Sequence, residues 1–180
     1  MQLPTKLETK NLILRPYNAL DWSGFLQFML SPQVTNYLNF TAEQTTPKGA
    51  RELFEMTLNS YTTSEPLFAL VIAQQKNDLF IGSCGFSTPD KQQNCECFYA
   101  LLPEYWGQGF ATEAMIQLLD YGFHQLGIKS VIAHVNRDNL ASIQVAKKLA
   151  MNYQGLIEFK GIPAQGKLFS LTKENYLARS

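Results

Sequence analysis

The stretch PEYWGQGFATEA, from Pro103 to Ala114, joins an apolar, strand-like run to a segment with helical spacing. Its two glycines, Gly107 and Gly109, lie one residue apart, where a chain can turn sharply between two elements. The first turn of a helix leaves backbone N–H groups without intrahelical partners, and such groups attract anions. The stretch therefore predicts a strand, an anion-binding glycine loop and a helix that begins at the loop.

Two common phosphate-binding motifs fit this loop poorly. GQGFAT resembles the dinucleotide fingerprint GxGxxG, but Thr112 occupies the place of the third glycine. No acidic residue ends a second strand about 20 residues further on, as that fingerprint requires. The Gly-Lys-Ser/Thr ending of a P-loop is missing as well. A plain turn between a strand and a helix, without any ligand, remains open at this point.

Length and charge narrow the class of protein. The chain has 180 residues, and we expect a single domain over residues 1–180. Its 15 basic and 15 acidic residues cancel, so we expect neither nucleic-acid binding nor a membrane-surface patch. No apolar run has the length of a signal peptide or a bilayer span, which favours a cytoplasmic protein.

The cysteines and histidines give no metal-binding pattern. Cys84, Cys95 and Cys97 form no even disulfide framework, and we expect reduced, mostly buried thiols. His124 and His134 belong to no HExxH or CxxC arrangement. We therefore predict no metal site and interpret both histidines as structural.

Hydrophobic periodicity predicts strands and helices in one α+β domain. Strands are expected at residues 11–17, 66–74, 79–86, 96–102 and 129–135, and two more between Tyr153 and Leu171 around a turn at 161–166. Helices are expected at residues 21–30, from Thr46-Pro47 onward, from the glycine loop to near Gly127, and after an N-cap at Asp138 or Asn139. The segment 34–40 is expected to be irregular and aromatic.

A resemblance to a known family adds to this prediction. PEYWGQGFATEA and the later VNRDNLASIQVAKKLAM (135–151) resemble the acetyl-CoA-binding core of the GNAT superfamily of N-acetyltransferases. The superfamily signature Arg/Gln-x-x-Gly-x-Gly/Ala is matched by residues 106–111, with Trp106 in place of Arg or Gln. This form is similar to the RimJ/RimL-type branch of ribosomal-protein N-terminal acetyltransferases, as are KLETKNLILRPY (6–17) and SPQVTNYL (31–38).

The resemblance implies a GNAT fold. Such a fold has three layers, with a mixed, mostly antiparallel central sheet of about six to seven strands flanked by about four helices. The resemblance also implies that the sheet is splayed between the fourth and fifth expected strands, 96–102 and 129–135.

The resemblance implies acetyl-CoA as the cosubstrate. The glycine loop would hold the pyrophosphate, through Gly107, Gln108, Gly109, Phe110, Ala111 and Thr112. The strand before it would pair with the pantetheine arm through the backbone of Tyr99, Leu101 and Leu102. Asn139 would hold the pantetheine amide. Cations that could meet the ribose phosphate are Arg137, Lys147 and Lys148, each of which has a plain surface charge as its alternative reading.

Two residues are candidates for the proton transfers. Glu96 matches the acidic position of the branch's Ala-Glu-Ile-Gly-Tyr motif, here with Phe98 in place of glycine, and is the candidate base. Many superfamily members protonate the leaving thiolate with a tyrosine, but that position falls on Ala146. Ser142 of the Asn-x-x-Ser motif is the candidate partner of the sulfur. The alternatives are a solvent-facing carboxylate for Glu96 and a first-turn hydroxyl for Ser142.

We therefore expect an N-acetyltransferase that moves acetyl from acetyl-CoA directly to a primary amine. The resemblance implies a protein N-terminus, such as that of a ribosomal protein, as the favoured acceptor. Such an acceptor needs only a modest base, since an α-amine has a reference pKa near 7.8 and a lysine near 10.4. Tyr37 and Phe40 are candidates for the walls of the acceptor groove. The alternatives are a small-molecule amine acetyltransferase, a non-catalytic acyl-CoA sensor and, more remotely, a nicotinamide-dependent reductase. Both a monomer and a homodimer are compatible with the sequence.

Overall fold

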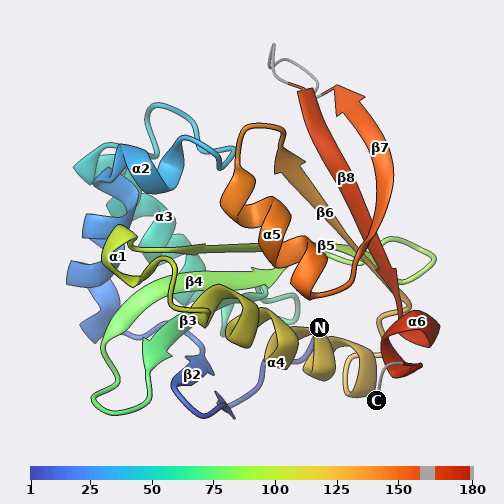
Figure 1. Cartoon of the computed structure of the whole chain (residues 1–180). Helices are drawn as coiled ribbons and strands as arrows, with labels where there is room; N and C mark the ends of the chain where they lie inside the picture. Colours follow the sequence, from blue (N-terminus) through green and yellow to red (C-terminus); the bar gives the residue numbers. More distant parts are fainter. Residues whose placement is uncertain (159–164, 179–180) are drawn as a thin grey trace. The chain divides into compact units, whose positions relative to one another are not determined.

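The computed structural model describes residues 1–158 and 165–178 of the chain. Within them lie eight strands, six α-helices and two short 3₁₀ helices. Hydrogen-bonded neighbours give the sheet order β1-β2-β3-β4-β5-β6-β8-β7 (Figure 1). The sheet is mixed and mostly antiparallel, with β5 and β6 parallel. The α+β fold is as expected, with eight strands in place of six or seven and more helices than four.

The chain divides into two compact units. One contains Met1–Gly85 and Tyr99–Leu118, and the other contains Phe86–Phe98 and Leu119–Ser180. Strand β5 (Asn94–Leu101) and helix α4 (Phe110–His124) each contribute residues to both units.

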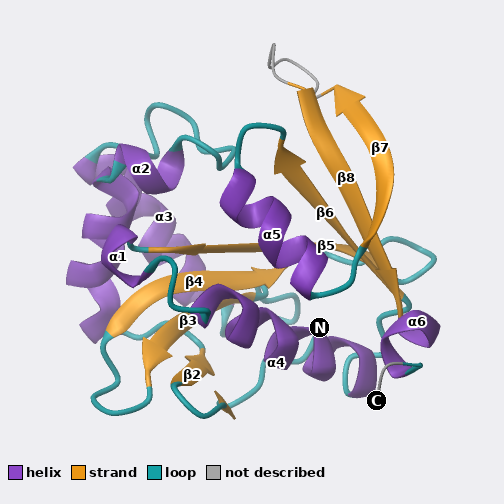
Figure 2. Ribbon diagram, viewed as in Figure 1, coloured by secondary structure: helices purple, strands orange, loops and turns teal. Residues whose placement is uncertain are grey.

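The first unit is built on an antiparallel meander. Its strands are β1 (Leu7–Glu8), β2 (Leu12–Arg15), β3 (Ala69–Gln74), most of β4 (Phe80–Phe86) and the end of β5. Its helices are η1 (Ala19–Asp21), α1 (Trp22–Leu30), α2 (Pro32–Thr35), α3 (Pro47–Ser60), η2 (Pro103–Tyr105) and the start of α4 (Figure 2). Helix α3 begins as expected, because the Thr46 side chain caps it by accepting from Gly49 N–H.

An aromatic cluster joins α1 and α3 to the strands of the first unit. Tyr17 meets Phe25 and Phe54 edge-to-face, with ring centroids 5.6 and 6.0 Å apart. Val71 of β3 and Phe80 of β4 belong to the same buried cluster. Because burial of each such side chain contributes about 1.5–3 kcal/mol, this cluster is a main source of the unit's stability.

A buried ion pair fixes the start of η1. Arg15 at the end of β2 donates from Nη1 and Nη2 to the two carboxylate oxygens of Asp21, over 2.8 and 2.9 Å. The Asp21 side chain is 3% exposed, and it also accepts from the backbone N–H of Asn18. Arg15 Nε donates in addition to Asp78 over 2.8 Å. The pair connects β2 to η1, which follows it.

The second unit carries the remaining strands. They are the start of β5, β6 (Ser130–Asn136), β7 (Asn152–Glu158) and β8 (Gln165–Thr172), and its helices are the end of α4, α5 (Leu140–Lys148) and α6 (Lys173–Leu177). The parallel β5–β6 ladder pairs Asn94–Glu96 with Ser130–Ile132, and β6 pairs with β8 along all its residues. The splay expected beyond the β5–β6 ladder involves residues of both units and stays a prediction.

Several details differ from the expectation. Strand β1 and helices α2 and α6 were not expected, and the segment 34–40 begins inside α2. Helix α4 ends at His124, three residues before Gly127. In the expected turn at 161–166, residues 161–164 lie outside the described residues and Gly166 belongs to β8. Among the described helices, none has the length and apolar character needed to cross a bilayer.

Candidate active site

Both glycines of the loop adopt a left-handed backbone, a conformation that the sequence analysis did not specify. Gly107 and Gly109 have φ angles of 72° and 84°, in the left-handed region that other residues rarely enter. A Cβ added at either glycine would meet nothing within 4 Å. The two glycines are therefore needed for the backbone path, and neither is explained by close packing against the rest of the chain.

The loop presents backbone donors at the start of α4. Glu113 N–H donates to Gly109 O over 3.0 Å and makes the first backbone bond of the helix. Within the described part of the chain, the N–H groups from Gly107 to Thr112 have no protein acceptor. Gly107, Gln108 and Gly109 are exposed. Free donors and the positive end of the helix dipole make this loop suitable for a phosphate.

Two side chains of the loop are used inside the protein. Trp106 Nε1 donates to Leu101 O over 2.7 Å, which ties the loop to the end of β5. Gln108 Nε2 donates to Glu104 O over 2.9 Å, which ties it to η2. Trp106 therefore has a structural role at the position where the superfamily signature has Arg or Gln, and the loop's backbone is left to meet the ligand.

Glu113 anchors the first turn of α4 to the turn between β1 and β2. Its carboxylate accepts from the Thr9 hydroxyl over 2.6 Å, from Asn11 N–H over 2.8 Å and from Asn11 Nδ2 over 2.9 Å. Partial burial alone would raise the pKa of Glu113, but these hydrogen bonds outweigh it and hold the pKa below its usual value. A negative charge in the first turn is also favoured by the helix dipole.

The end of β5 has backbone groups directed to both sides of the strand. Leu102 N–H donates to Ile81 O of β4 over 2.9 Å, and Leu102 O accepts from Tyr105 N–H over 3.0 Å. Since alternate residues of a strand direct their N–H and C=O groups to opposite sides, Tyr99 and Leu101 direct theirs away from β4. The backbone of Leu102 is bonded within the chain, and Leu101 O accepts from Trp106, so the predicted pairing of Tyr99, Leu101 and Leu102 with the pantetheine arm stays a prediction.

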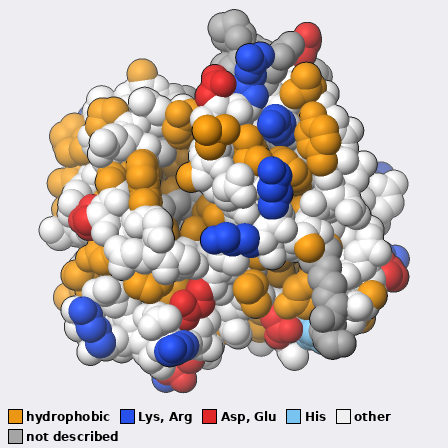
Figure 3. Space-filling model, viewed as in Figure 1, with side chains coloured by type: hydrophobic (Ala, Val, Ile, Leu, Met, Phe, Trp, Pro, Cys, Tyr) orange, Lys and Arg blue, Asp and Glu red, His pale blue; other side chains and the backbone are white. Residues whose placement is uncertain are grey.

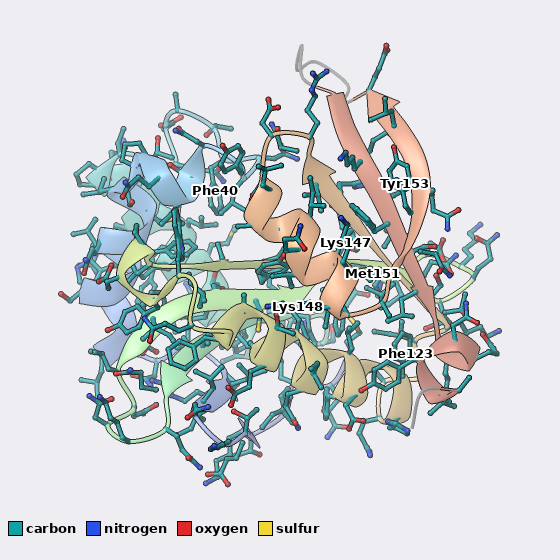
Figure 4. All side chains as sticks on the ribbon, in the orientation of Figure 1. Phe40, Phe123, Lys147, Lys148, Met151 and Tyr153 are labelled. Atoms are coloured by element: carbon teal, nitrogen blue, oxygen red, sulfur yellow. The ribbon has the colours of Figure 1, made fainter. Side chains whose placement is uncertain are left out.

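In the second unit, Asn139 is the N-cap of α5, as one of the two alternatives predicts. Its Oδ1 accepts from Ser142 N–H over 3.0 Å. Ser142 lies in the first turn and is partly buried. Lys147 and Lys148 lie in the last turn of α5 (Figure 4), where cations also stabilise the helix dipole. The cosubstrate roles proposed for these residues stay predictions.

The Glu96 carboxylate contacts a histidine on the neighbouring strand. Its Oε1 lies 2.9 Å from Nδ1 of His134 on β6, and the two side chains are 42% and 30% exposed. The analysis of the sequence treated His134 as structural. The signal that could have indicated this pair is the alternation in KSVIAHV, which places His134 on the polar face of a strand.

The three cysteines are free and buried, as expected. Cys95 and Cys97 lie on either side of Glu96 and, by the alternation of the strand, point to its opposite face. Burial raises the pKa of the Cys95 thiol to about 11 and that of Cys97 to about 12. Neither thiol is therefore ionised near neutral pH, and Glu96 lies on the other face of the strand.

The predicted acceptor residues lie in the first unit. Phe40 is partly buried and packs against the aromatic cluster, while Tyr37 is 46% exposed. Phe40 thus contributes to the core whether or not it lines a groove. Lys and Arg side chains occur in small separate groups on the face seen in Figure 3, interspersed with Asp and Glu. Among the described residues, no three His, Cys, Asp or Glu side chains form a possible metal site.

The fold and the glycine loop define a class of protein before any comparison is made. A strand, an open loop with two left-handed glycines and a helix that begins at the loop form the kind of arrangement that binds coenzyme phosphates in proteins. The mixed sheet, in which β5 is antiparallel to a meander on one side and parallel to β6, is the architecture of an acetyltransferase of the GNAT type.

Comparisons with known proteins show the family. Residues 11–152 match the model of the acetyltransferase (GNAT) domain. The chain is 33% identical over 175 residues to an uncharacterized N-acetyltransferase, p20, of Bacillus licheniformis, covering 94% of this chain and 97% of p20. The chain therefore belongs to the GNAT family, and it is an acetyl-CoA-dependent N-acetyltransferase.

Two further similarities concern proteins with named acceptors. The crystal structure of a ribosomal-protein-S5-alanine acetyltransferase from Vibrio fischeri matches with a TM-score of 0.78 at 16% identity, covering 96% of this chain and 99% of that chain. At this identity the likeness shows the fold. Spermidine N(1)-acetyltransferase of Escherichia coli (strain K12) is 36% identical over 53 residues, which is 29% of this chain and 28% of that protein.

Proposed function

We propose that this enzyme acetylates the α-amine of a protein N-terminus, as the RimJ/RimL-type enzymes do. The observation that carries the proposal is Glu96, a partly exposed carboxylate on β5 and the candidate proton acceptor of the site. A carboxylate is a modest base. It suits an α-ammonium, with a reference pKa near 7.8, far better than a lysine ammonium near 10.4.

The size of this preference can be worked out. At about pH 7.5 roughly a third of α-amines are already neutral, whereas neutralising a lysine at that pH costs about 4 kcal/mol. The names of structural neighbours with the same fold, a ribosomal-protein-S5-alanine acetyltransferase and a RimJ from Mycobacterium smegmatis, agree with an N-terminal acceptor.

In this proposal each residue has a role in binding or in proton transfer. The backbone from Gly107 to Thr112 holds the pyrophosphate of acetyl-CoA, and Tyr99 and Leu101 pair with its pantetheine arm. Glu96 takes part in removing the proton that the acceptor ammonium loses before its nitrogen attacks the thioester carbonyl. Ser142 donates a hydrogen bond to the sulfur as it leaves. Residues 1–180 act as a single acetyltransferase domain, an interpretation supported by the family match across both units.

A second candidate is supported by the partial similarity to spermidine N(1)-acetyltransferase, which favours a small polyamine as the acceptor. A direct comparison separates the two. The release of CoA is measured with a peptide that begins Ala-Arg, with the same peptide acetylated in advance at its N-terminus, and with spermidine. Release with the unblocked peptide alone supports the proposal. Release with spermidine and with neither peptide supports the second candidate.

A further inference from the structure

Glu96 and His134 form a pair on the partly exposed face of the second unit. Nδ1 of His134 lies 2.9 Å from Oε1 of Glu96. Both backbone groups of Glu96 are bonded to Ser87. Glu96 N–H donates to Ser87 Oγ over 2.8 Å, and Ser87 N–H donates to Glu96 O over 2.8 Å. The carboxylate therefore rises from a fixed position on its strand.

The imidazole is fixed in the same way. Glu96 is the register partner of Ile132, and His134 follows two residues later on the same face of β6. On the other side of β6, His134 is the register partner of Leu168 in the antiparallel ladder with β8. Two paired strands thus set the distance between carboxylate and imidazole, and rigid elements of this kind suit catalytic groups.

The geometry decides which ring nitrogen carries the proton. An ionised carboxylate can only accept, so the contact requires a hydrogen on Nδ1 of His134. In a neutral ring Nε2 is then the basic nitrogen. A carboxylate on Nδ1–H also orients the ring and stabilises the imidazolium that forms when Nε2 takes up a proton.

Simple acid–base chemistry favours such a pair over a carboxylate alone. With reference pKa values near 7.8 for an α-ammonium and 4.3 for a carboxyl group, direct proton transfer is unfavourable by about 3,000-fold. With an imidazole, whose reference value is near 6.5, it is unfavourable by only about 20-fold. An imidazole backed by a carboxylate is therefore matched to an α-amine acceptor.

We propose that Glu96 and His134 act as one proton-accepting dyad in acetyl transfer, with His134 taking the proton and Glu96 orienting the ring. The inference rests on the proposed function, and it makes His134 the base and Glu96 its positioning residue. One proton of the acceptor ammonium passes to Nε2 and then to solvent. The amine nitrogen forms the bond to the acetyl carbon, the C–S bond breaks, and the second proton of the nitrogen reaches the thiolate.

The strands around the pair place further side chains on the same face of the sheet. Within the described parts of β5, β6 and β8, the neighbours on this face are uncharged. They are Asn94 and Phe98 on β5, Ile132 and Asn136 on β6, and Leu168 and Ser170 on β8. On the opposite face of β5 the thiols of Cys95 and Cys97 flank Glu96, and burial keeps both neutral.

Kinetics on the peptide that begins Ala-Arg test the dyad. His134→Asn keeps a donor toward Glu96 but removes the proposed basic nitrogen. It should lower kcat/KM by about 100-fold and leave an acid-side fall of kcat/KM that is set by the substrate's own α-amine. Glu96→Gln should cost a similar factor, and the double variant should be little worse than either single one. His124→Asn, at the other histidine, is the matched control and should match the wild type.

Two kinetic outcomes would overturn the dyad. One is a His134→Asn enzyme with the wild-type kcat/KM and the wild-type pH profile. The other is a double variant whose loss equals the product of the two single losses, because independent groups behave in this way.

If the peptide is not a substrate, the proposed function is wrong, and kinetics cannot test the dyad. A spectroscopic measurement then tests the dyad independently. In the His124→Asn protein, the ¹⁵N signals of the one remaining imidazole report its tautomer. The dyad predicts the Nδ1–H form at neutral pH and a change of tautomer on adding Glu96→Gln. An Nε2–H form in the protein with Glu96 intact, or no response to Glu96→Gln, contradicts it.

Discussion

Replacement of Gly109 by alanine tests two properties of the glycine loop: its left-handed backbone, which affects stability, and its proposed phosphate binding, which affects the affinity for CoA. The φ angle of Gly109 is 84°, and a Cβ there would meet nothing within 4 Å. The substitution therefore costs strain without a clash, about 1–2 kcal/mol for an L-residue in the left-handed region. For a chain of this size, that corresponds to a fall in Tm of roughly 2–8 °C.

In Gly109→Ala the free energy of CoA binding should fall by more than the free energy of unfolding. The N–H groups of the loop are the proposed phosphate donors, and the added methyl group would occupy open space in the same loop. Loss of one hydrogen bond to a charged group costs about 1.5–3 kcal/mol, or roughly 10- to 100-fold in Kd. Isothermal titration with CoA measures the change in Kd, and thermal unfolding without ligand measures the change in Tm.

Gly127→Ala is the matched control. Gly127 has a φ angle of 69° and open space around its missing Cβ, but it lies beyond the end of α4. The two variants should lose similar stability, and only Gly109→Ala should lose affinity for CoA. If Gly109→Ala bound CoA within twofold of the wild type, the loop would not be the phosphate site and the reasoning would be refuted.

Three further variants test the structural roles assigned above. Asp21→Asn leaves Arg15 without its buried carboxylate and should lower the free energy of unfolding by about 3 kcal/mol in thermal denaturation, and an unchanged Tm would contradict the pair. The pKa of Glu113 is lowered in the folded state from its ordinary 4.5, so its stabilising contribution is present above that value and is lost as the pH falls below it. Glu113→Gln should therefore reduce the difference in stability between neutral and acid pH, and an unchanged difference would be evidence against its anchoring role. Trp106→Phe removes the bond to Leu101 O and should raise the KM for acetyl-CoA by about 3- to 10-fold in steady-state kinetics, with little effect if the indole N–H is dispensable.

Local chemistry explains why much of the fold could be predicted. The Thr46 cap and Pro47 mark the start of α3, and Asn139 marks the start of α5, because a side-chain cap needs no information from distant residues. Alternating apolar residues likewise located the strands of the meander. Strand β1, with two residues, was missed, since a pattern needs more than one repeat to be recognised.

The site was predicted in part for the same reason. The glycine loop is a continuous segment, so its motif and its turn could be predicted from neighbouring residues, whereas the left-handed φ angles come from the structure. The roles of Trp106 and His134 depend on contacts with Leu101 and Glu96, and the second of these spans 38 positions of the chain. Periodicity shows which face a residue occupies, and the register between strands decides which residue it meets.

The most direct test of the account uses a single peptide that carries both kinds of amine. It begins Ala-Arg and contains one internal lysine, and the acetyl group is located by mass spectrometry after reaction with acetyl-CoA. The account predicts acetyl on the α-amine alone, because the base it describes is matched to a reference pKa near 7.8. Acetyl on the lysine, or no acetylated peptide from an enzyme that binds acetyl-CoA, would contradict it.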